Sequence, residues 1–358
     1  MVEPVHIGRV TIHEMPDHMH ASGHVAGGQI GTAFTCLLWH PGLEKLICGS
    51  TSFAGDLLHT FDPATGEFEC LDYGRFGEPY EMKIHRALEL GGDGCVYGAS
   101  SCLHDVNKRH LAPGGRIFRW DPRTREFSHV GMPCPPDYIQ TISLDWSRRM
   151  IYGMTYPVFN FFAWSLDERA LVHSHFMESI WHVGAIDEDG GYWGTWGTDR
   201  NLFRYDPVEN SCEFFNHGLP PALGSALYHG TWPVDSMVAA REGLIYIGLL
   251  SCEIYALDPA TAELAYVGRP LPSERCPSLA EGDDGLIYGV GGNNNDVRVF
   301  TYDRQTNSFD IIGILRDSIY NEPCFRPHDI VKVGDTLYIG ETDNPARAGN
   351  LWECTLER

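Results

Sequence analysis

A short apolar run that ends in glycine recurs seven times along the chain. Turns rich in glycine and acidic residues precede several of these runs, as in GGDG ahead of Cys95 and EGDDG ahead of Leu286. An apolar run after such a turn is typical of the second strand of a β-hairpin. The runs end 41 to 55 residues apart, at Gly49, Gly98, Gly153, Gly194, Gly248, Gly289 and Gly340.

A second pattern follows each of the first six runs. Apolar and polar residues flank an aspartate-centred turn, as in LFRYDPVENSCEFF. Aspartate suits the start of such a turn because its carboxylate can accept a hydrogen bond from the backbone two residues later. The turns start at Asp62, Asp121, Asp167, Asp206, Asp258 and Asp303. Two hairpins per repeat predict a four-stranded sheet, and a repeat of roughly 40–50 residues with four strands is typical of a β-propeller blade.

The seventh copy of the repeat is one strand short. The chain ends in GNLWECTLER, which supplies a third strand, whereas residues 5–14 are strand-like and have no hairpin partner nearby. Pairing these two ends would remove an exposed sheet edge. The sequence therefore predicts an all-β fold, a single seven-bladed β-propeller over residues 1–358 whose N-terminal strand completes the C-terminal blade. The innermost strands are expected to start near residues 34, 83, 138, 181, 234, 277 and 327.

Composition agrees with a folded, strand-rich chain and limits its partners. The 358 residues are 43% hydrophobic, and the 39 glycines and 22 prolines favour many short strands over long helices. The net charge of −22 argues against nucleic acid or an anionic membrane as the main partner.

The cysteines and the N-terminus suggest a compartment. Eleven cysteines occur without a Cys-x-x-Cys pair, which fits free thiols in a reducing environment. No stretch approaches about 18 consecutive apolar residues, and the opening MVEPVHIGRV lacks the features of a secretory signal. We therefore expect a cytoplasmic protein without a membrane span.

Propeller geometry indicates where a ligand would bind. The loops that precede the innermost strands, and those between the second and third strands, surround one mouth of the central channel. Four histidines from four blades fall near the same point of the repeat: His85, His182, His229 and His328. The fold would bring them around one axis. The alternative is a structural role between blades, because the chain has 17 histidines.

Other polar side chains in these loops supply the remaining parts of a β-elimination site. The reaction removes a proton α to a carboxylate, so it needs a base and a cation that stabilises the resulting dianion. The candidate bases are His85 and, after it, Tyr138 and His182. The candidate substrate contacts are Arg86, Gln140, Arg200, Arg275 and Arg326. Ordinary surface ion pairs are the alternative for the arginines.

Two of these arginines are neighbours of a candidate histidine in the sequence, and strand geometry predicts whether each lies in the same site as that histidine. Side chains alternate along a strand, so Arg86 shares a site with His85 only if the strand begins after it or a bulge intervenes. Arg326 precedes His328 by two residues and would lie on the same side of an extended segment.

A metal ion is a further expectation. Three histidines with an amide or carboxylate can hold Mn²⁺ or Zn²⁺, and His182, His229 and His328 are the candidate ligands. No nucleotide cofactor is expected, because phosphate-binding and dinucleotide motifs are absent. The signatures of WD40 and kelch repeats are absent too, which disfavours a pure interaction scaffold.

The seven repeats, the lack of a signal and the histidine-rich channel loops resemble the seven-bladed propeller polysaccharide lyases, above all the cytoplasmic oligogalacturonate lyase family. Lyases of rhamnose–glucuronate linkages are similar. The resemblance implies a histidine base, an arginine that binds the uronate, and a metal held by histidines and a glutamine. The expected function is cleavage of uronic-acid-containing oligosaccharides by β-elimination at the channel mouth, with a small anionic carbohydrate as partner. The chain departs from this pattern at His173 and His175, which fall in an outer hairpin.

Other classes stay open. Gluconolactonase-like propellers resemble the chain in architecture and hold Ca²⁺ with oxygen ligands. A glycoside hydrolase would need two facing carboxylates, for which Asp235 and Glu322 are available. The third alternative is a non-catalytic ligand sensor or scaffold. The sequence specifies neither the sugar and its linkage nor the oligomeric state.

Overall fold

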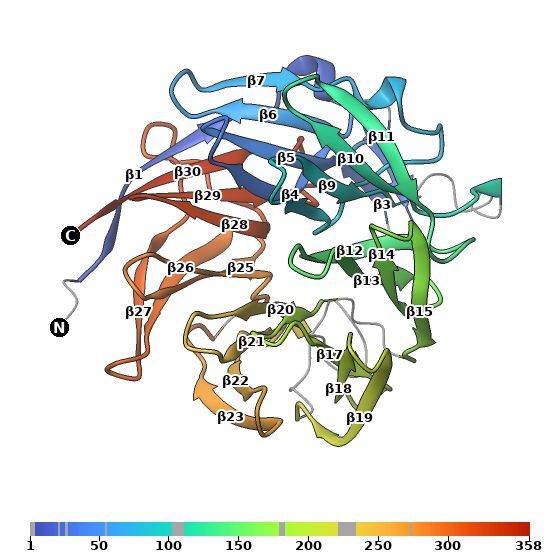
Figure 1. Cartoon of the computed structure of the whole chain (residues 1–358). Coiled ribbons are helices and arrows are strands. Elements are labelled where there is room, and N and C mark those ends of the chain that lie inside the picture. The colour runs from blue at the N-terminus through green and yellow to red at the C-terminus, as the bar shows by residue number, and fades with distance from the viewer. Residues whose placement is uncertain are drawn as a thin grey trace.

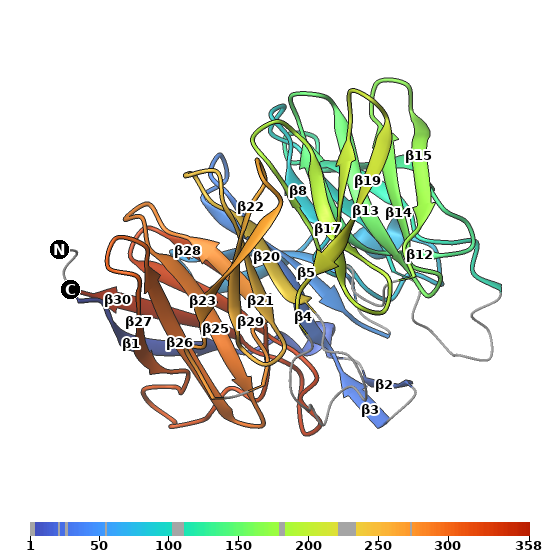
Figure 2. The ribbon, with the colours of Figure 1, turned by 90° about the horizontal axis from the view of Figure 1, so that it is seen from below.

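Seven four-stranded antiparallel sheets surround a central axis like the blades of a propeller (Figure 1). The structure, a computed structural model, describes residues 4–20, 22–25, 28–53, 56–101, 111–178, 183–220, 234–272 and 274–358. The predicted all-β, seven-bladed fold is confirmed. A separate hairpin, β2 (Ser22–Val25) with β3 (Gly28–Gly31), projects from the ring (Figure 2).

The first three blades follow one another in chain order, and their strands run from the channel outward. Blade 1 consists of β4 (Ala33–His40), β5 (Lys45–Thr51), β6 (Leu58–Asp62) and β7 (Glu67–Cys70). Blade 2 consists of β8 (Leu88–Leu90), β9 (Val96–Ala99), β10 (Ile117–Asp121) and β11 (Glu126–Gly131). Blade 3 consists of β12 (Tyr138–Asp145), β13 (Met150–Tyr156), β14 (Asn160–Ser165) and β15 (Ala170–Phe176).

The remaining blades keep the same order, except that the last one takes its outer strand from the N-terminus. Blade 4 consists of β16 (Ala185–Ile186), β17 (Tyr192–Trp196), β18 (Asn201–Asp206) and β19 (Ser211–Gly218). Blade 5 consists of β20 (Val234–Ala239), β21 (Ile245–Leu249), β22 (Ile254–Asp258) and β23 (Glu263–Gly268). Blade 6 consists of β24 (Ser278–Glu281), β25 (Ile287–Asn293), β26 (Asp296–Asp303) and β27 (Ser308–Ile314). Blade 7 consists of β28 (Pro327–Val333), β29 (Thr336–Glu341), β30 (Leu351–Glu357) and β1 (His6–His13).

The predicted closure of the ring is confirmed, because β1 pairs antiparallel with β30. Val10 of β1 is buried and belongs to the same hydrophobic cluster as Cys354. On the free side of β1, the backbone N–H of Val10 donates to Ser318 Oγ at 2.8 Å, and the Ser318 N–H donates back to the Val10 carbonyl. The outer edge of this blade is therefore partly covered, which limits pairing with other chains.

Close packing explains the glycine that ends each apolar run, and in four blades the third strand supplies the crowding side chain. In four blades this glycine lies directly opposite a phenylalanine of the third strand, and a Cβ on the glycine would overlap the aromatic ring. The pairs are Gly98–Phe118, Gly153–Phe162, Gly194–Phe203 and Gly289–Phe300. In the other three blades the opposite residue is Leu58, Ile254 or Leu351. Glycine recurs because a neighbouring side chain occupies the space above it.

The aspartate-centred turns form as expected in five of six cases. Each of these aspartates accepts a hydrogen bond at Oδ1 from the N–H two residues later, at 2.8–3.0 Å: Asp62, Asp121, Asp206, Asp258 and Asp303. Asp167 is the exception. Its carboxylate accepts from Arg149 Nε at 3.2 Å, and the turn is instead closed by Ser165 Oγ, which accepts from the N–H of Glu168.

The innermost strands of blades 2 and 4 begin later than the sequence suggests. β8 begins at Leu88 rather than near residue 83, and β16 begins at Ala185 rather than near residue 181. In blade 2 the cause is Arg86, whose φ of 46° is left-handed and interrupts the extended backbone. Lys83, just before it, bridges the sheets of blades 1 and 2.

Packing between blades fixes the ring. The largest hydrophobic cluster spans blades 1, 2 and 3 and includes Ile47, Trp120 and Ile151, and another joins blades 6 and 7 with β1. Helix is scarce in the described segments, where η1 (Asp17–Met19) and η2 (Tyr73–Arg75) are single 3₁₀ turns. No helix in that part of the chain has the length and apolar character needed to cross a membrane.

Removing residues 1–13 should leave β30 without its outer partner. We expect the truncated protein to melt at a lower temperature or to aggregate, since an unpaired sheet edge pairs with other chains. Val10→Ala should destabilise mildly, because full burial of a valine is worth roughly 1.5–3 kcal/mol and alanine keeps part of it. His6→Ala, at an exposed position of the same strand, should have little effect. Thermal denaturation tests this; a truncated protein that melts cooperatively at the parent temperature would contradict it.

Candidate functional site

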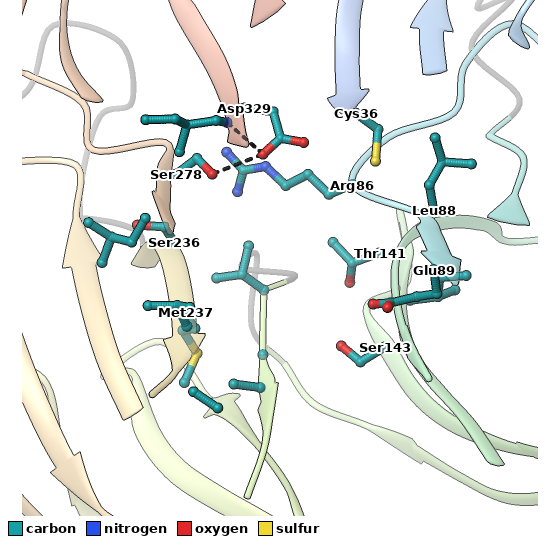
Figure 3. Close-up of a pocket in the computed structure, with 18 of the residues that line it drawn as sticks. Cys36, Arg86, Leu88, Glu89, Thr141, Ser143, Ser236, Met237, Ser278 and Asp329 are labelled. Carbon is teal, nitrogen blue, oxygen red and sulfur yellow. Dashed lines mark hydrogen bonds between the residues drawn. The ribbon is translucent and has the colours of Figure 1, made fainter. Parts of the chain in front are cut away.

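A cavity of about 530 Å³ runs along the central axis, and the innermost segments of all seven blades line it (Figure 3). Its lining mixes hydroxyl groups, aliphatic side chains and a few charged groups. Arg86 and Asp329 lie at the end where the innermost strands begin. Of the residues that the sequence singled out, Arg86 lines the cavity, and His85 and His328 directly precede the lining residues Arg86 and Asp329.

Two of the four predicted histidines meet there. His85, from the segment before β8, and His328, from β28, lie with their Nε2 atoms 3.0 Å apart. Their rings are 4.7 Å apart between centroids and inclined by 77°. Each side chain is only 6% exposed. The ring of blades thus joins residues 243 positions apart in the sequence.

The hydrogen bonds of this pair determine where its protons lie. Nδ1 of His85 is 3.0 Å from the carbonyl oxygen of Gln140, which can only accept, so this nitrogen carries a proton. In the neutral pair, Nε2 of His85 must then accept the proton that Nε2 of His328 donates. The remaining lone pair of the neutral pair therefore lies on Nδ1 of His328.

Beside the histidines, Asp235 binds two arginines. Arg275 donates from Nε to Oδ2 at 2.8 Å and from a terminal nitrogen to Oδ1 at 3.2 Å. Arg86 donates to the Asp235 carbonyl oxygen, and another of its nitrogens lies 3.6 Å from Oδ1. Burial by itself would raise the pKa of Asp235, but the charges of Arg275 and Arg86 outweigh it and hold this pKa below its ordinary value.

Arg86 reaches this position because of its backbone. The left-handed conformation at Arg86 satisfies the condition stated above for His85 and Arg86 to share a site. Its side chain leaves blade 2 and contacts Asp235 in blade 5, so it crosses the channel. Its Nε is buried and has no hydrogen-bond partner among the described residues.

Lys83 is a functional candidate that the sequence reasoning missed. Burial lowers its pKa to about 8; Asp343 counteracts this, while Arg86 and Arg275 add to it. Its ammonium group has no hydrogen bond or ion pair to any residue that the structure describes. Its position two residues ahead of His85 in the same loop was the available signal.

Among the described residues, three cations of this layer interact electrostatically with three acidic groups, Asp235, Asp329 and Asp343. Lys83, Arg86 and Arg275 contribute three cations, and Asp235 is the carboxylate that directly contacts two of them. Asp329 adds a second acidic group whose pKa is raised by burial, although it accepts hydrogen bonds from Ser278 Oγ and two backbone N–H groups. Within this layer Lys83 has no directly contacting carboxylate among the described residues, so it is the cation best placed to pair with an anionic ligand.

Three other residues that the sequence singled out, Tyr138, Arg200 and Gln140, have different surroundings. The Tyr138 ring is 1% exposed and packs 5.1 Å from that of Tyr156, in a small apolar cluster, which does not favour a role as base. Arg200 is 1% exposed, and burial lowers its pKa. Gln140 holds His85 through its backbone, and its side-chain oxygen Oε1 is buried without a partner in the described part of the chain.

Arg326 lies at the rim of the layer. It donates to Asn293 Oδ1 at 2.8 Å and to Asp343 Oδ2 at 2.9 Å. Asp343 also interacts electrostatically with Lys83, so Arg326 borders the cationic layer without contacting His328 in any described hydrogen bond.

The predicted metal ligands cannot be compared as a set. His182 and His229 lie outside the described residues, whereas His328 pairs with His85. Within the described ranges, no group of three or more His, Cys, Asp or Glu side chains is arranged to hold a metal ion. His173 and His175 are on β15, the outer strand of blade 3, away from the channel.

Comparisons with known proteins agree on the fold alone. No family model matches the chain, and no curated protein matches it. Among solved structures, a catalytically inactive histidine-to-alanine variant of virginiamycin B lyase from Staphylococcus aureus, with quinupristin, has a TM-score of 0.61 at 10% identity and covers 97% of this chain and 99% of that one. The RRP9 WD40 repeats have a TM-score of 0.61 at 12% identity, with 98% of both chains covered.

A third similar structure is a sensor domain. The extracellular domain of a putative hybrid two-component system from B. thetaiotaomicron has a TM-score of 0.60 at 15% identity. The match covers 93% of this chain and 39% of that one, so the chain spans about two-fifths of its length. The seven-bladed propeller found here is thus a fold shared with lyases, sensor domains and WD40 proteins.

Asp235→Asn should leave Arg86 and Arg275 without their shared counter-charge. Removing one partner of a buried ion pair typically costs about 3–5 kcal/mol of unfolding free energy. Asp296→Asn, which breaks an exposed pair with Arg298, should cost less than about 1 kcal/mol.

The pH dependence of this effect has a definite sign. Because the folded state lowers the pKa of Asp235, its stabilisation is present above the ordinary value of about 3.9 and is lost as the pH falls through the folded-state pKa. Urea denaturation of the parent and Asp235→Asn should therefore differ at neutral pH and converge in acid. Equal stability at neutral pH would show that the aspartate does not hold the two arginines.

Proposed function

We propose that the chain is a lyase that cleaves uronic-acid-containing oligosaccharides by β-elimination at the strand-start end of its central channel. The observation that carries the proposal is the His85–His328 pair, with its protonation set by a backbone carbonyl, beside a layer of buried cations. A base and cations in one enclosed place are the two requirements of this reaction.

The cations support binding of the uronate carboxylate. Lys83 and Arg86 both have pKa values lowered by burial, so an incoming carboxylate would favour their charged forms. Arg86 has a buried Nε without a described partner, and guanidinium groups recognise carboxylates through such N–H donors. Arg326, at the rim, would contact the approaching substrate.

The histidine pair supports proton removal. His328 would accept the α-proton at Nδ1, and the positive charge that develops would be stabilised through its Nε2 hydrogen bond to His85. The electrons of the broken C–H bond form the carbon–carbon double bond, and the bond from the β-carbon to the glycosidic oxygen breaks. That oxygen leaves as an alcohol after it takes a proton from water, and the proton on His328 returns to the solvent. The dianion formed on the way would be stabilised by Arg86 and Lys83. In this scheme His85, the first candidate base from sequence, is the positioning residue.

The alternative role of His328 is that of a metal ligand. Together with His182 and His229 it would form the predicted site for Mn²⁺ or Zn²⁺. Nε2 of His328 cannot bind a metal while it donates to His85, so only its Nδ1 could do so within the present pair. Metal analysis of the purified chain, followed by assay after chelation, separates metal-dependent from metal-independent elimination.

A non-catalytic ligand-binding propeller is the second candidate. It is favoured by the low exposure of the histidine pair and by the engagement of Arg275 and Arg86 with Asp235. Such a protein would bind a uronate and release it unchanged. The formation of an unsaturated product distinguishes the two candidates.

His328→Ala should lower the rate of unsaturated-product formation by roughly 10²–10⁴. His85→Ala should also lower this rate, and it should shift the pH dependence of the rate because the tautomer of His328 is no longer fixed. The assay is ultraviolet absorbance with a panel of uronate oligosaccharides. His175→Ala, exposed on β15, is the matched control and should retain the parent rate. Full activity of His328→Ala, or no unsaturated product from any member of the panel, would refute the proposal.

Binding of the uronate should weaken as the pH rises above about 8, where Lys83 loses its charge. Calorimetric titration with a galacturonate oligosaccharide at several pH values measures this effect. Lys83→Met should bind more weakly at neutral pH and lose the decline, whereas Lys45→Met in blade 1 should behave as the parent. An unchanged pH dependence in Lys83→Met would remove Lys83 from the site.

A further inference from the structure

The cavity continues past Arg86 toward the ends of the innermost strands, where Glu89 of β8 lines it. Glu89 makes no hydrogen bond or ion pair with any residue that the structure describes, although its carboxyl group lies in a protein-enclosed channel. The residue is only partly buried, so water can solvate its carboxyl group in the free protein. A cationic ligand in the channel could take the place of that water and supply the charge that no described residue provides.

The other titratable groups that face this space do not supply that charge. Arg86 is engaged with Asp235, and Asp329 accepts hydrogen bonds from Ser278 and from backbone N–H groups. Burial raises the pKa of the Cys36 thiol, and nearby Asp329 and Glu89 raise it further, so this thiol stays protonated. The described lining from β12, β20, β24 and the segment around β16 carries neutral side chains.

The walls around Glu89 fit a ligand with an apolar part. Figure 3 shows Glu89 and Ser143 on one side of the opening and Met237 across from them. Leu88 and Leu144 add aliphatic surface. The whole cavity, about 530 Å³, lies in the size range of small-molecule sites.

We propose that the part of the channel around Glu89 binds a small organic ammonium ion, with the ammonium group on the Glu89 carboxylate and the hydrocarbon part against Met237 and Leu144. An ammonium group supplies the hydrogen-bond donors and the positive charge that Glu89 lacks. The Ser143 hydroxyl is available as an additional acceptor. This site is on the opposite side of Arg86 from the histidine pair and does not depend on the proposed lyase activity.

The ionisation state of Glu89 distinguishes an ammonium ligand from a neutral ligand. Burial raises the pKa of Glu89 to about 8, so near pH 7 the carboxyl group is mainly protonated. An ammonium ion favours the ionised form, and its binding must release a proton from Glu89. A neutral polyol could hydrogen-bond to the protonated acid and would release none.

The experiment is calorimetric titration of the full chain with butylammonium and cyclohexylammonium, and with butanol and cyclohexanol as neutral counterparts. Titrations in two buffers of different ionisation enthalpy give the number of protons released. We expect binding of an ammonium ion with release of close to one proton near pH 7, and tighter binding with less release above about pH 8.

Variants assign the effect to the carboxyl group. Glu89→Gln, the isostere of the protonated acid, should weaken ammonium binding by at least about tenfold and abolish proton release. Glu67→Gln, exposed on β7, is the matched control, and His328→Ala should bind as the parent does. Loss of elimination with retained ammonium binding would therefore concern only the lyase proposal. Absence of Glu89-dependent binding for both ions, or equal binding of the alcohols without proton release, would overturn the present one.

Discussion

Antiparallel pairing of the first strand with the last fixes the geometry of everything on the channel axis. β1 and β30 join the two ends of the chain in one blade, so the seven sheets form a closed ring and not an open stack. His328 belongs to that final blade, and His85 belongs to the second. Their 3.0 Å contact across blade 1 requires both to keep their places in the ring. A local strand pairing at the rim thus controls a distance at the centre.

The structure also divides the channel into two chemically different spaces. Near the strand starts, the cations Lys83, Arg86 and Arg275 lie close together, and the histidine pair lies beside them. Past Arg86, Glu89 is an acidic group without a described cation near it. One strand-start segment of blade 2 supplies both the cation that separates the spaces and the acid of the second. Opposite electrostatic preferences therefore occur within a few residues of one another.

Sequence reasoning succeeded where the signal was repeated and failed where it depended on a single backbone angle. The blades and the ring closure follow from a periodic pattern of apolar runs, glycines and aspartate turns, and the histidine pair follows from its place in that repeat. Nothing in the sequence marks the left-handed φ of Arg86, because a non-glycine residue in that conformation carries no compositional sign. Gln140 was selected for its side chain, yet its backbone carbonyl is what binds His85. Glu89 was overlooked because a glutamate on a short strand looks like an ordinary solvated residue.

The position of Arg86 affects how small molecules can move along the central channel. Its side chain extends from blade 2 to the backbone of blade 5, so it lies across the channel. A small molecule that moves along the axis must pass this side chain and its contacts with Asp235. Exchange between the histidine side and the Glu89 side would therefore depend on movement of Arg86, and the two spaces could hold different ligands at the same time.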